Sequence, residues 1–184
     1  MGKVRYKGME KVRFEKILNE IGKLDHRELM AYWMDQEVKE AEMYYKLYQM
    51  SREVNWDERV SKLFYRLYRE SLGHAEALLR MFKEMFPGEK PPKVNVAPLE
   101  VELSEEKLRD LVYHGNLKEI LEYLMGTEKL AHDVYMHLAK RASDEETKAT
   151  LLWLAKIEHG HYKKLRELYN ALFGNGSESS NEAQ

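Results

Sequence analysis

The sequence predicts an all-α protein built as a bundle of four long helices. Apolar residues recur at intervals of three and four residues over four long stretches. No stretch shows the alternation of apolar and polar residues that is typical of a β-strand. All four prolines lie between residues 87 and 98, so they interrupt none of the long helical stretches.

Length and composition favour one soluble domain. A chain of 184 residues can bury a sizeable core, and we expect a single domain over residues 1–173. Charged residues make up 34% of the chain, yet the net charge is only −2. This balance does not indicate a nucleic-acid partner or a membrane surface. The polar segment 174–184 is expected to be a disordered tail.

The sequence carries no sign of membrane insertion or export. No apolar run approaches the roughly 20 residues that a membrane-spanning helix needs. The N-terminal residues lack the apolar core of a secretory signal, so we expect a cytoplasmic protein.

The first helices are placed by their end signals. An extra N-terminal amphipathic helix is expected over residues 9–21, and Gly22 ends it. Asp25 is a good N-cap for a long helix that runs to about Ser51. Asn55 with Glu58 resembles the start of the next long helix.

That second long helix is expected to end near Phe86, where the proline-rich linker 87–103 begins. Fully extended, this linker reaches about 55 Å, more than the roughly 40 Å of a long helix. The chain can therefore cross the bundle between its second and third long helices.

Three helices follow the linker. Ser104 is expected to cap a short helix that ends near Tyr113, and a long helix runs over about 116–142. A capping box of Ser143 and Glu146 then starts the last helix.

The last long helix, which ends near residue 173, carries an apolar seam with a polar interruption. The seam consists of Leu151, Leu154, Glu158, His161, Leu165, Leu168 and Leu172. Glu158 and His161 project about 60° apart on one face. Burying such a pair costs on the order of several kcal/mol unless its charge is compensated. A metal ion is one compensation, and a simple buried Glu–His hydrogen bond is the alternative.

The two halves of the chain, about 26–86 and 116–173, repeat one another. The aligned polar pairs are Glu37 with Glu128, Tyr44 with Tyr135, Gly73 with Gly160 and His74 with His161. The apolar positions of the helices align as well. This coincidence indicates an internal duplication.

The repeat places acidic and imidazole groups on all four long helices. Glu37 and Tyr44 lie seven residues apart on one helix face, as do Glu128 and Tyr135, and His74 lies on the second long helix. Two Glu from the first and third helices, with Glu-x-x-His from the other two, can hold two iron or manganese ions. Because the chain has no cysteine, any metal must be held by carboxylate and histidine.

These motifs resemble the ferritin-like di-iron carboxylate superfamily, and the rubrerythrin-type erythrins most closely. The resemblance covers about residues 26–172. It rests on Glu37…Tyr44, His74, Glu128-Lys129-Leu130-Ala131…Tyr135 and Glu158-His159-Gly160-His161. It implies a ferritin-like four-helix bundle with a long crossover between the second and third long helices.

The same resemblance implies the roles of the site residues. The implied metal ligands are Glu37, His74, Glu128, Glu158 and His161. Tyr44 and Tyr135 are implied to hydrogen-bond to ligand carboxylates.

One position departs from the family pattern. Three residues before His74 the chain has Ser71, where the family has Glu. Glu70 lies about 40° away from His74 around the helix and is a candidate replacement ligand. The alternative is that Glu70 faces solvent or the rim of the site.

Glu40 is a second candidate for the missing carboxylate. It lies three residues after Glu37 and aligns with Ala131, so it is expected to point inward. Erythrins that resemble this chain also carry an extra Glu three positions after a helix ligand. The alternative is a rim carboxylate that pairs with Lys or Arg.

By resemblance, the expected function is reduction of peroxide or O2 at a pair of iron ions, in protection against oxidative stress. Manganese is the alternative metal, and Glu40, Tyr44 and Tyr135 are the candidate catalytic residues. A rubredoxin domain needs four cysteines, so a separate electron-donor protein is expected, together with a homo-oligomer, most simply a dimer. The rival functions are iron oxidation and storage, a di-iron oxygenase, and a metal-binding or structural bundle with a degenerate site.

Overall fold

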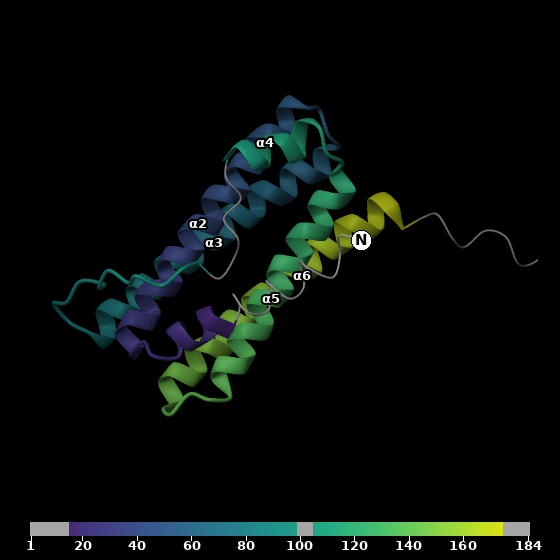
Figure 1. The fold of residues 1–184 in the computed structure, drawn as a ribbon. Coiled ribbons are helices and arrows are strands. Elements are labelled where there is room, and N and C mark those ends of the chain that lie inside the picture. Colours follow the sequence, from purple (N-terminus) through teal and green to yellow (C-terminus); the bar gives the residue numbers. More distant parts are fainter. Residues whose placement is uncertain (1–14, 99–104, 175–184) are drawn as a thin grey trace, which may run out of the picture. The chain divides into compact units, whose positions relative to one another are not determined.

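The computed structural model describes residues 15–98 and 105–174 (Figure 1). Residues 15–21 are helical, and the further helices are α2 (His26–Glu53), α3 (Glu58–Met85), α4 (Glu105–Tyr113), α5 (Leu117–Ala139) and α6 (Glu145–Phe173). Within the described ranges all regular structure is helical. The predicted all-α class and the four long helices are therefore confirmed.

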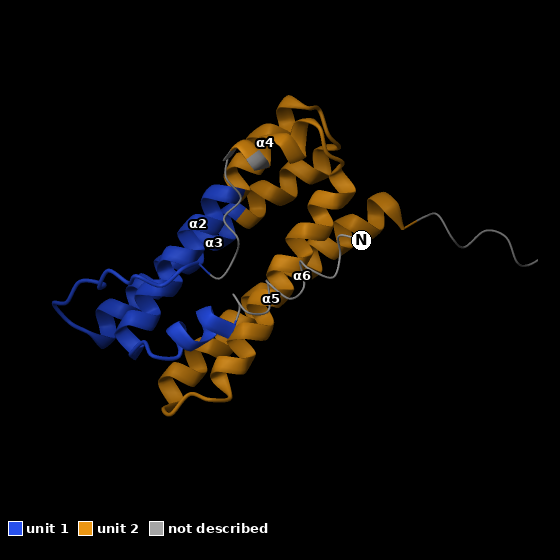
Figure 2. Ribbon diagram, in the orientation of Figure 1, with its two compact units in different colours: residues 1–43, 68–102 blue, residues 44–67, 103–184 orange. Residues whose placement is uncertain are grey.

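The chain divides into two compact units, which Figure 2 distinguishes by colour. Unit 1 comprises Met1–Met43 and Tyr68–Glu102, and unit 2 comprises Tyr44–Leu67 and Leu103–Gln184. Unit 1 thus contains the first part of α2 and the second part of α3. Unit 2 contains the remainder of both helices together with α4, α5 and α6.

The core of unit 1 is formed by residues at helical spacing. Met30 and Trp33 of α2 and Leu78 and Phe82 of α3 are completely buried. The proline-rich segment that follows α3 is fixed to the start of α2 at two points. The Tyr32 hydroxyl donates to the carbonyl oxygen of Ala97 at 3.0 Å, and Arg27 pairs with Glu89 at 2.5 Å.

In unit 2 the helices α5 and α6 pack against each other along the predicted seam. The buried residues of α6 are Thr150, Leu151, Leu154, Ala155, Glu158, His161, Leu165 and Leu168. They include every predicted seam position except Leu172, which is half-buried near the end of the helix. The periodicity of the sequence therefore identified the buried face of α6 correctly.

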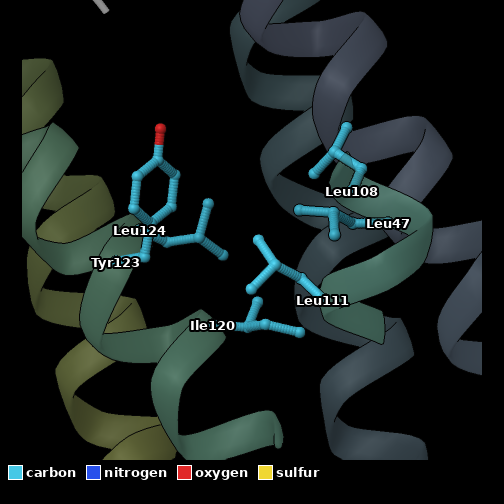
Figure 3. Close-up of a pocket in the computed structure, with 6 residues that line it drawn as sticks. All are labelled: Leu47, Leu108, Leu111, Ile120, Tyr123 and Leu124. Carbon is cyan, nitrogen blue, oxygen red and sulfur yellow. The ribbon is translucent and has the colours of Figure 1, made fainter. Parts of the chain in front are cut away.

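The short helix α4 contributes to a small apolar pocket within unit 2 (Figure 3). The pocket is lined by Leu47 of α2, Leu108 and Leu111 of α4, and Ile120, Tyr123 and Leu124 of α5. Amphipathic α4 thus lies with its leucines against two long helices.

The end of α2 differs from the prediction. Asn55 was expected to begin the next helix, but it adopts a left-handed conformation with φ of 51°. Its backbone N–H donates to the carbonyl of Arg52, and the N–H of Trp56 donates to the carbonyl of Ser51. These two bonds form a Schellman motif, in which a left-handed residue ends a helix. Asn tolerates this conformation better than most residues, which explains why it can end a helix as well as begin one.

Two helix caps were also predicted at the wrong residue. Asp57 caps α3, because its carboxylate accepts a backbone N–H from the first turn at 2.9 Å. Asp144, and not Ser143, caps α6 by accepting the N–H of Thr147 at 2.7 Å. In both cases a neighbouring Asp competes successfully, since Asp caps helices as well as Asn or Ser does. Helix α5 begins directly after its cap Asn116, close to the expected start, but it ends at Ala139, three residues before the expected end.

Three predictions fall on residues that the structure does not describe. The start of the first helix at Met9, the cap at Ser104 and the tail from residue 175 lie outside the described residues. The end of the first helix at Gly22 is confirmed. None of the helices in the described ranges offers the long apolar stretch that crossing a bilayer requires.

The left-handed conformation of Asn55 can be tested by a pair of substitutions. Asn55→Val should destabilise the protein by about 1–2 kcal/mol, because a β-branched side chain is strained at positive φ. For a chain of this length the thermal midpoint should fall by roughly 2–8 °C, as followed by circular dichroism. Asn55→Gly should leave the midpoint unchanged or raise it. Equal losses for both substitutions would contradict the Schellman assignment.

Candidate metal centre

Three ionisable side chains of unit 2 converge within the α5–α6 pair. Glu128 comes from α5, and Glu158 and His161 come from α6. Each offers one ligand atom, and these atoms lie within 4.8 Å of one another. The Nδ1 atom of His161 is 3.6 Å from Glu128 Oε2 and 3.9 Å from Glu158 Oε2.

This group is buried in apolar surroundings. Glu128, Glu158 and His161 are only 1%, 4% and 1% exposed, and Leu154 and Leu165 lie one turn away on either side along α6. Two carboxylates in such a place repel one another and are poorly solvated, so they need a shared proton or a positive charge beside them. A protonated His161 or a metal cation can supply that charge.

A tyrosine holds one of these carboxylates in place. The hydroxyl of Tyr44, a completely buried residue of α2 that belongs to unit 2, donates a hydrogen bond to Glu128 Oε1. Burial raises the pKa of Glu128, but the hydrogen bond and charge of His161, aided by Glu158 and Tyr44, outweigh it. The pKa of Glu128 therefore lies below its ordinary value. The lowered pKa favours the carboxylate form of Glu128, which is the form that binds a metal.

Unit 1 contains a second carboxylate–histidine group, built from α2 and α3. His74 Nδ1 lies 3.4 Å from Glu37 Oε2, and Ser71 Oγ donates to Glu40 Oε2 at 3.2 Å. Glu37 and Glu40 are 2% and 7% exposed, whereas the His74 side chain is 22% exposed. The imidazole of this group is therefore more exposed to solvent than that of His161 in unit 2.

The contact between Glu40 and Ser71 bears on the missing family carboxylate. The Glu40 carboxylate reaches the position on α3 where the repeat would otherwise carry a Glu. Its burial favours the inward-pointing hypothesis over a solvent-exposed rim carboxylate. Glu70 is half-buried on the same helix, and its ligation stays a prediction.

Two further residues near Glu128 belong to the same helix. Tyr135 is 2% exposed and lies two turns along the same face of α5, and its predicted hydrogen bond to a ligand carboxylate stays a prediction. His132 uses its Nδ1 atom in a 2.8 Å hydrogen bond with the backbone carbonyl of Ala155. That bond ties α5 to α6 beside the candidate ligands.

Comparison with known proteins gives one family and one similar structure. The family model for rubrerythrin matches residues 39–169, a range that includes every candidate site residue except Glu37. A solved structure of a hypothetical protein from Pyrococcus furiosus is similar with a TM-score of 0.59 and 23% sequence identity. The similarity covers 85% of this chain and 96% of that one, and it shows the fold alone. No curated protein matches the sequence. The family match confirms the predicted ferritin-like class of helical bundle.

The role of Tyr44 can be tested by removing its hydroxyl. Tyr44→Phe should weaken metal binding roughly 10- to 100-fold, because a hydrogen bond that orients a ligand carboxylate is lost. Anaerobic titration with Fe²⁺ measures the affinity. Tyr45→Phe, which alters an exposed neighbour on the same helix, is the matched control. Equal affinities of the two variants would refute the role of Tyr44.

Proposed function

This chain belongs to the rubrerythrin family, and from that premise we propose that it is a di-iron oxidoreductase that reduces peroxide or O2. The observation that carries the proposal is the buried group of Glu128, Glu158 and His161, whose ligand atoms lie within 4.8 Å of one another. Family membership supports a pair of iron ions, and the predicted internal duplication would supply two sets of ligands.

The residues fit such metal ions chemically. Carboxylate oxygens and imidazole nitrogens suit Fe²⁺ and Mn²⁺, and the group in unit 2 offers two carboxylates and one imidazole. Their combined charge is negative when His161 is neutral, so a divalent cation would remove the cost of burying them. The proposed ligands are Glu37, His74, Glu128, Glu158 and His161, with Glu40 in the role that Ser71 cannot perform. Manganese is the alternative metal.

The protein's own residues have defined tasks in this function. The iron pair, when bound, supplies two electrons, one from each ion. Tyr44 orients Glu128 through its hydrogen bond, and the leucines beside Glu158 exclude bulk water. Reduction of hydrogen peroxide to two waters also consumes two protons. Glu40, buried and hydrogen-bonded to the Ser71 hydroxyl, is proposed as their carrier if it does not itself bind the metal.

The electrons are proposed to come from a separate donor protein. The sequence contains no cysteine, so it offers no ligands for a rubredoxin-type iron. A homodimer acting in the cytoplasm completes the proposal.

The second candidate function is a metal-binding bundle with an incomplete site. The observation in its favour is Ser71, whose hydroxyl replaces a family carboxylate within the group of unit 1. Metal stoichiometry separates this candidate from the first.

The proposed function is tested by loading the protein with iron without oxygen. The wild type should bind about two Fe²⁺ per chain, and added peroxide should be consumed as the iron is oxidised, which optical absorption follows. Glu158→Gln should lose most of this binding because a neutral amide is a poor ligand for Fe²⁺. Glu167→Gln, an exposed change on the same helix, is the matched control. Tight binding of a single zinc ion and no reaction with peroxide would refute the proposal.

The role of Glu40 has its own test. Glu40→Gln should lower the iron content from about two ions per chain to about one, because the carboxylate beside Ser71 is removed. Adding Ser71→Glu to that variant should restore the second ion, since it returns a carboxylate to the same place. Glu42→Gln on the exposed face of α2 is the control. Elemental analysis measures the result, and an unchanged iron content in Glu40→Gln would contradict the assignment.

A further inference from the structure

Three tyrosines of unit 2 form a cluster that neither the fold nor the metal centre explains. Tyr45 and Tyr48 lie on α2 and Tyr65 lies on α3. The ring centroids of Tyr45 and Tyr48 are 6.0 Å apart, and those of Tyr48 and Tyr65 are 5.1 Å apart. We call these three residues the tyrosine cluster.

The cluster lies at the surface. Tyr45 and Tyr65 are 40% and 43% exposed, and Tyr48 is half-buried between them. The phenol oxygen of Tyr48 accepts a hydrogen bond from the exposed guanidinium of Arg52 at 3.1 Å. Rings that served only as core packing would be enclosed, whereas these phenols can exchange protons with water.

The tyrosine cluster is linked to the candidate metal centre through Tyr44, which lies one helical turn before Tyr48 on α2. Tyr44 precedes Tyr45, and Tyr48 follows Tyr44 by four residues, so their side chains are neighbours along α2. Tyr44 itself donates to Glu128, a proposed metal ligand. The order Tyr44, Tyr48, Tyr65 thus runs from a completely buried phenol through a half-buried one to an exposed one.

On the basis of the proposed function, we propose that the tyrosine cluster and Tyr44 form a route by which oxidising equivalents leave the metal centre for the protein surface. The route operates when peroxide arrives and the electron donor is absent. The tyrosines then supply the missing electrons, Tyr44 first and the surface tyrosines last. Phenols suit this task because they release an electron and a proton together, which phenylalanine or leucine does not.

Each proton in this transfer has a destination. When Tyr44 loses an electron, its phenolic proton stays within the hydrogen bond to Glu128, and the phenol is restored when Tyr48 reduces Tyr44. Tyr48 releases its own proton near Arg52, where solvent has access.

Two tyrosyl radicals at the surface can join by a carbon–carbon bond between their rings. Counted from the two intact tyrosines, each residue has then lost one hydrogen atom. The net reaction converts one hydrogen peroxide and two tyrosines into one dityrosine and two waters.

The experiment uses the full chain, loaded with iron and treated with hydrogen peroxide without any reductant. We expect a tyrosyl radical by electron paramagnetic resonance of rapidly frozen samples. We also expect dityrosine fluorescence and a cross-linked peptide that joins α2 to α3. The iron-free protein should give none of these signals.

Matched variants separate the route from nonspecific oxidation. Tyr48→Phe should abolish the cross-link between α2 and α3 while the number of Fe²⁺ ions bound per chain stays at the wild-type level. Tyr169→Phe, which changes a half-buried tyrosine of α6 outside the cluster, should leave both unchanged.

Two results would overturn the inference alone. One is peroxide consumption by the wild type without radical or cross-link, and the other is cross-linking that does not require iron. A wild type that binds iron but consumes no peroxide would overturn the proposed function as well.

Discussion

The burial of carboxylates among leucines is the constraint on which the proposed site depends. Glu128 and Glu158 are almost completely buried beside a single imidazole, in helices whose neighbouring turns are apolar. Water cannot solvate these charges, so the protein must do so or bind a cation. The hydroxyl of Tyr44 and the ring of His161 supply part of that compensation, which is why the pKa of Glu128 is lowered despite its burial. A divalent ion would supply the remainder.

The carboxylate–histidine group of unit 1 meets the same constraint with different residues. Glu37 and His74 repeat the pairing of Glu128 and His161, but Ser71 leaves one carboxylate missing from α3. Glu40 of α2 places a carboxylate beside Ser71, so the group keeps its negative charge although the carboxylate comes from α2 and not from α3. If these residues bind metal as proposed, a carboxylate from α2 can replace one that α3 lacks, because both reach the same buried position.

Helical periodicity was sufficient to predict which residues are buried, because the spacing of apolar residues fixes the face that a helix turns inward. Glu158 and His161 lie on the buried face of α6 for this reason. Helix ends were harder to predict, since they are decided by competition between neighbours. Asn55 can cap a helix or end one, and only the backbone of the folded chain shows that it adopts positive φ. The contacts between Tyr48 and Tyr65 could not be predicted at all, because they depend on how α2 and α3 are aligned along their lengths.

Tyr44 connects these observations, since one side chain serves both the carboxylate chemistry and the aromatic cluster. Its hydroxyl donates to Glu128 and so orients that carboxylate, and it adds to the larger effect of His161 in lowering the pKa of Glu128. The same hydrogen bond gives a phenolic proton somewhere to go if Tyr44 loses an electron, and without such an acceptor a buried tyrosine would have to form an unsolvated cation. The hydrogen bond that orients Glu128, a proposed metal ligand, therefore also makes Tyr44 easier to oxidise. Tyr48 at the next turn and the exposed Tyr65 beyond it then determine whether the oxidising equivalent stays on Tyr44 or reaches the surface.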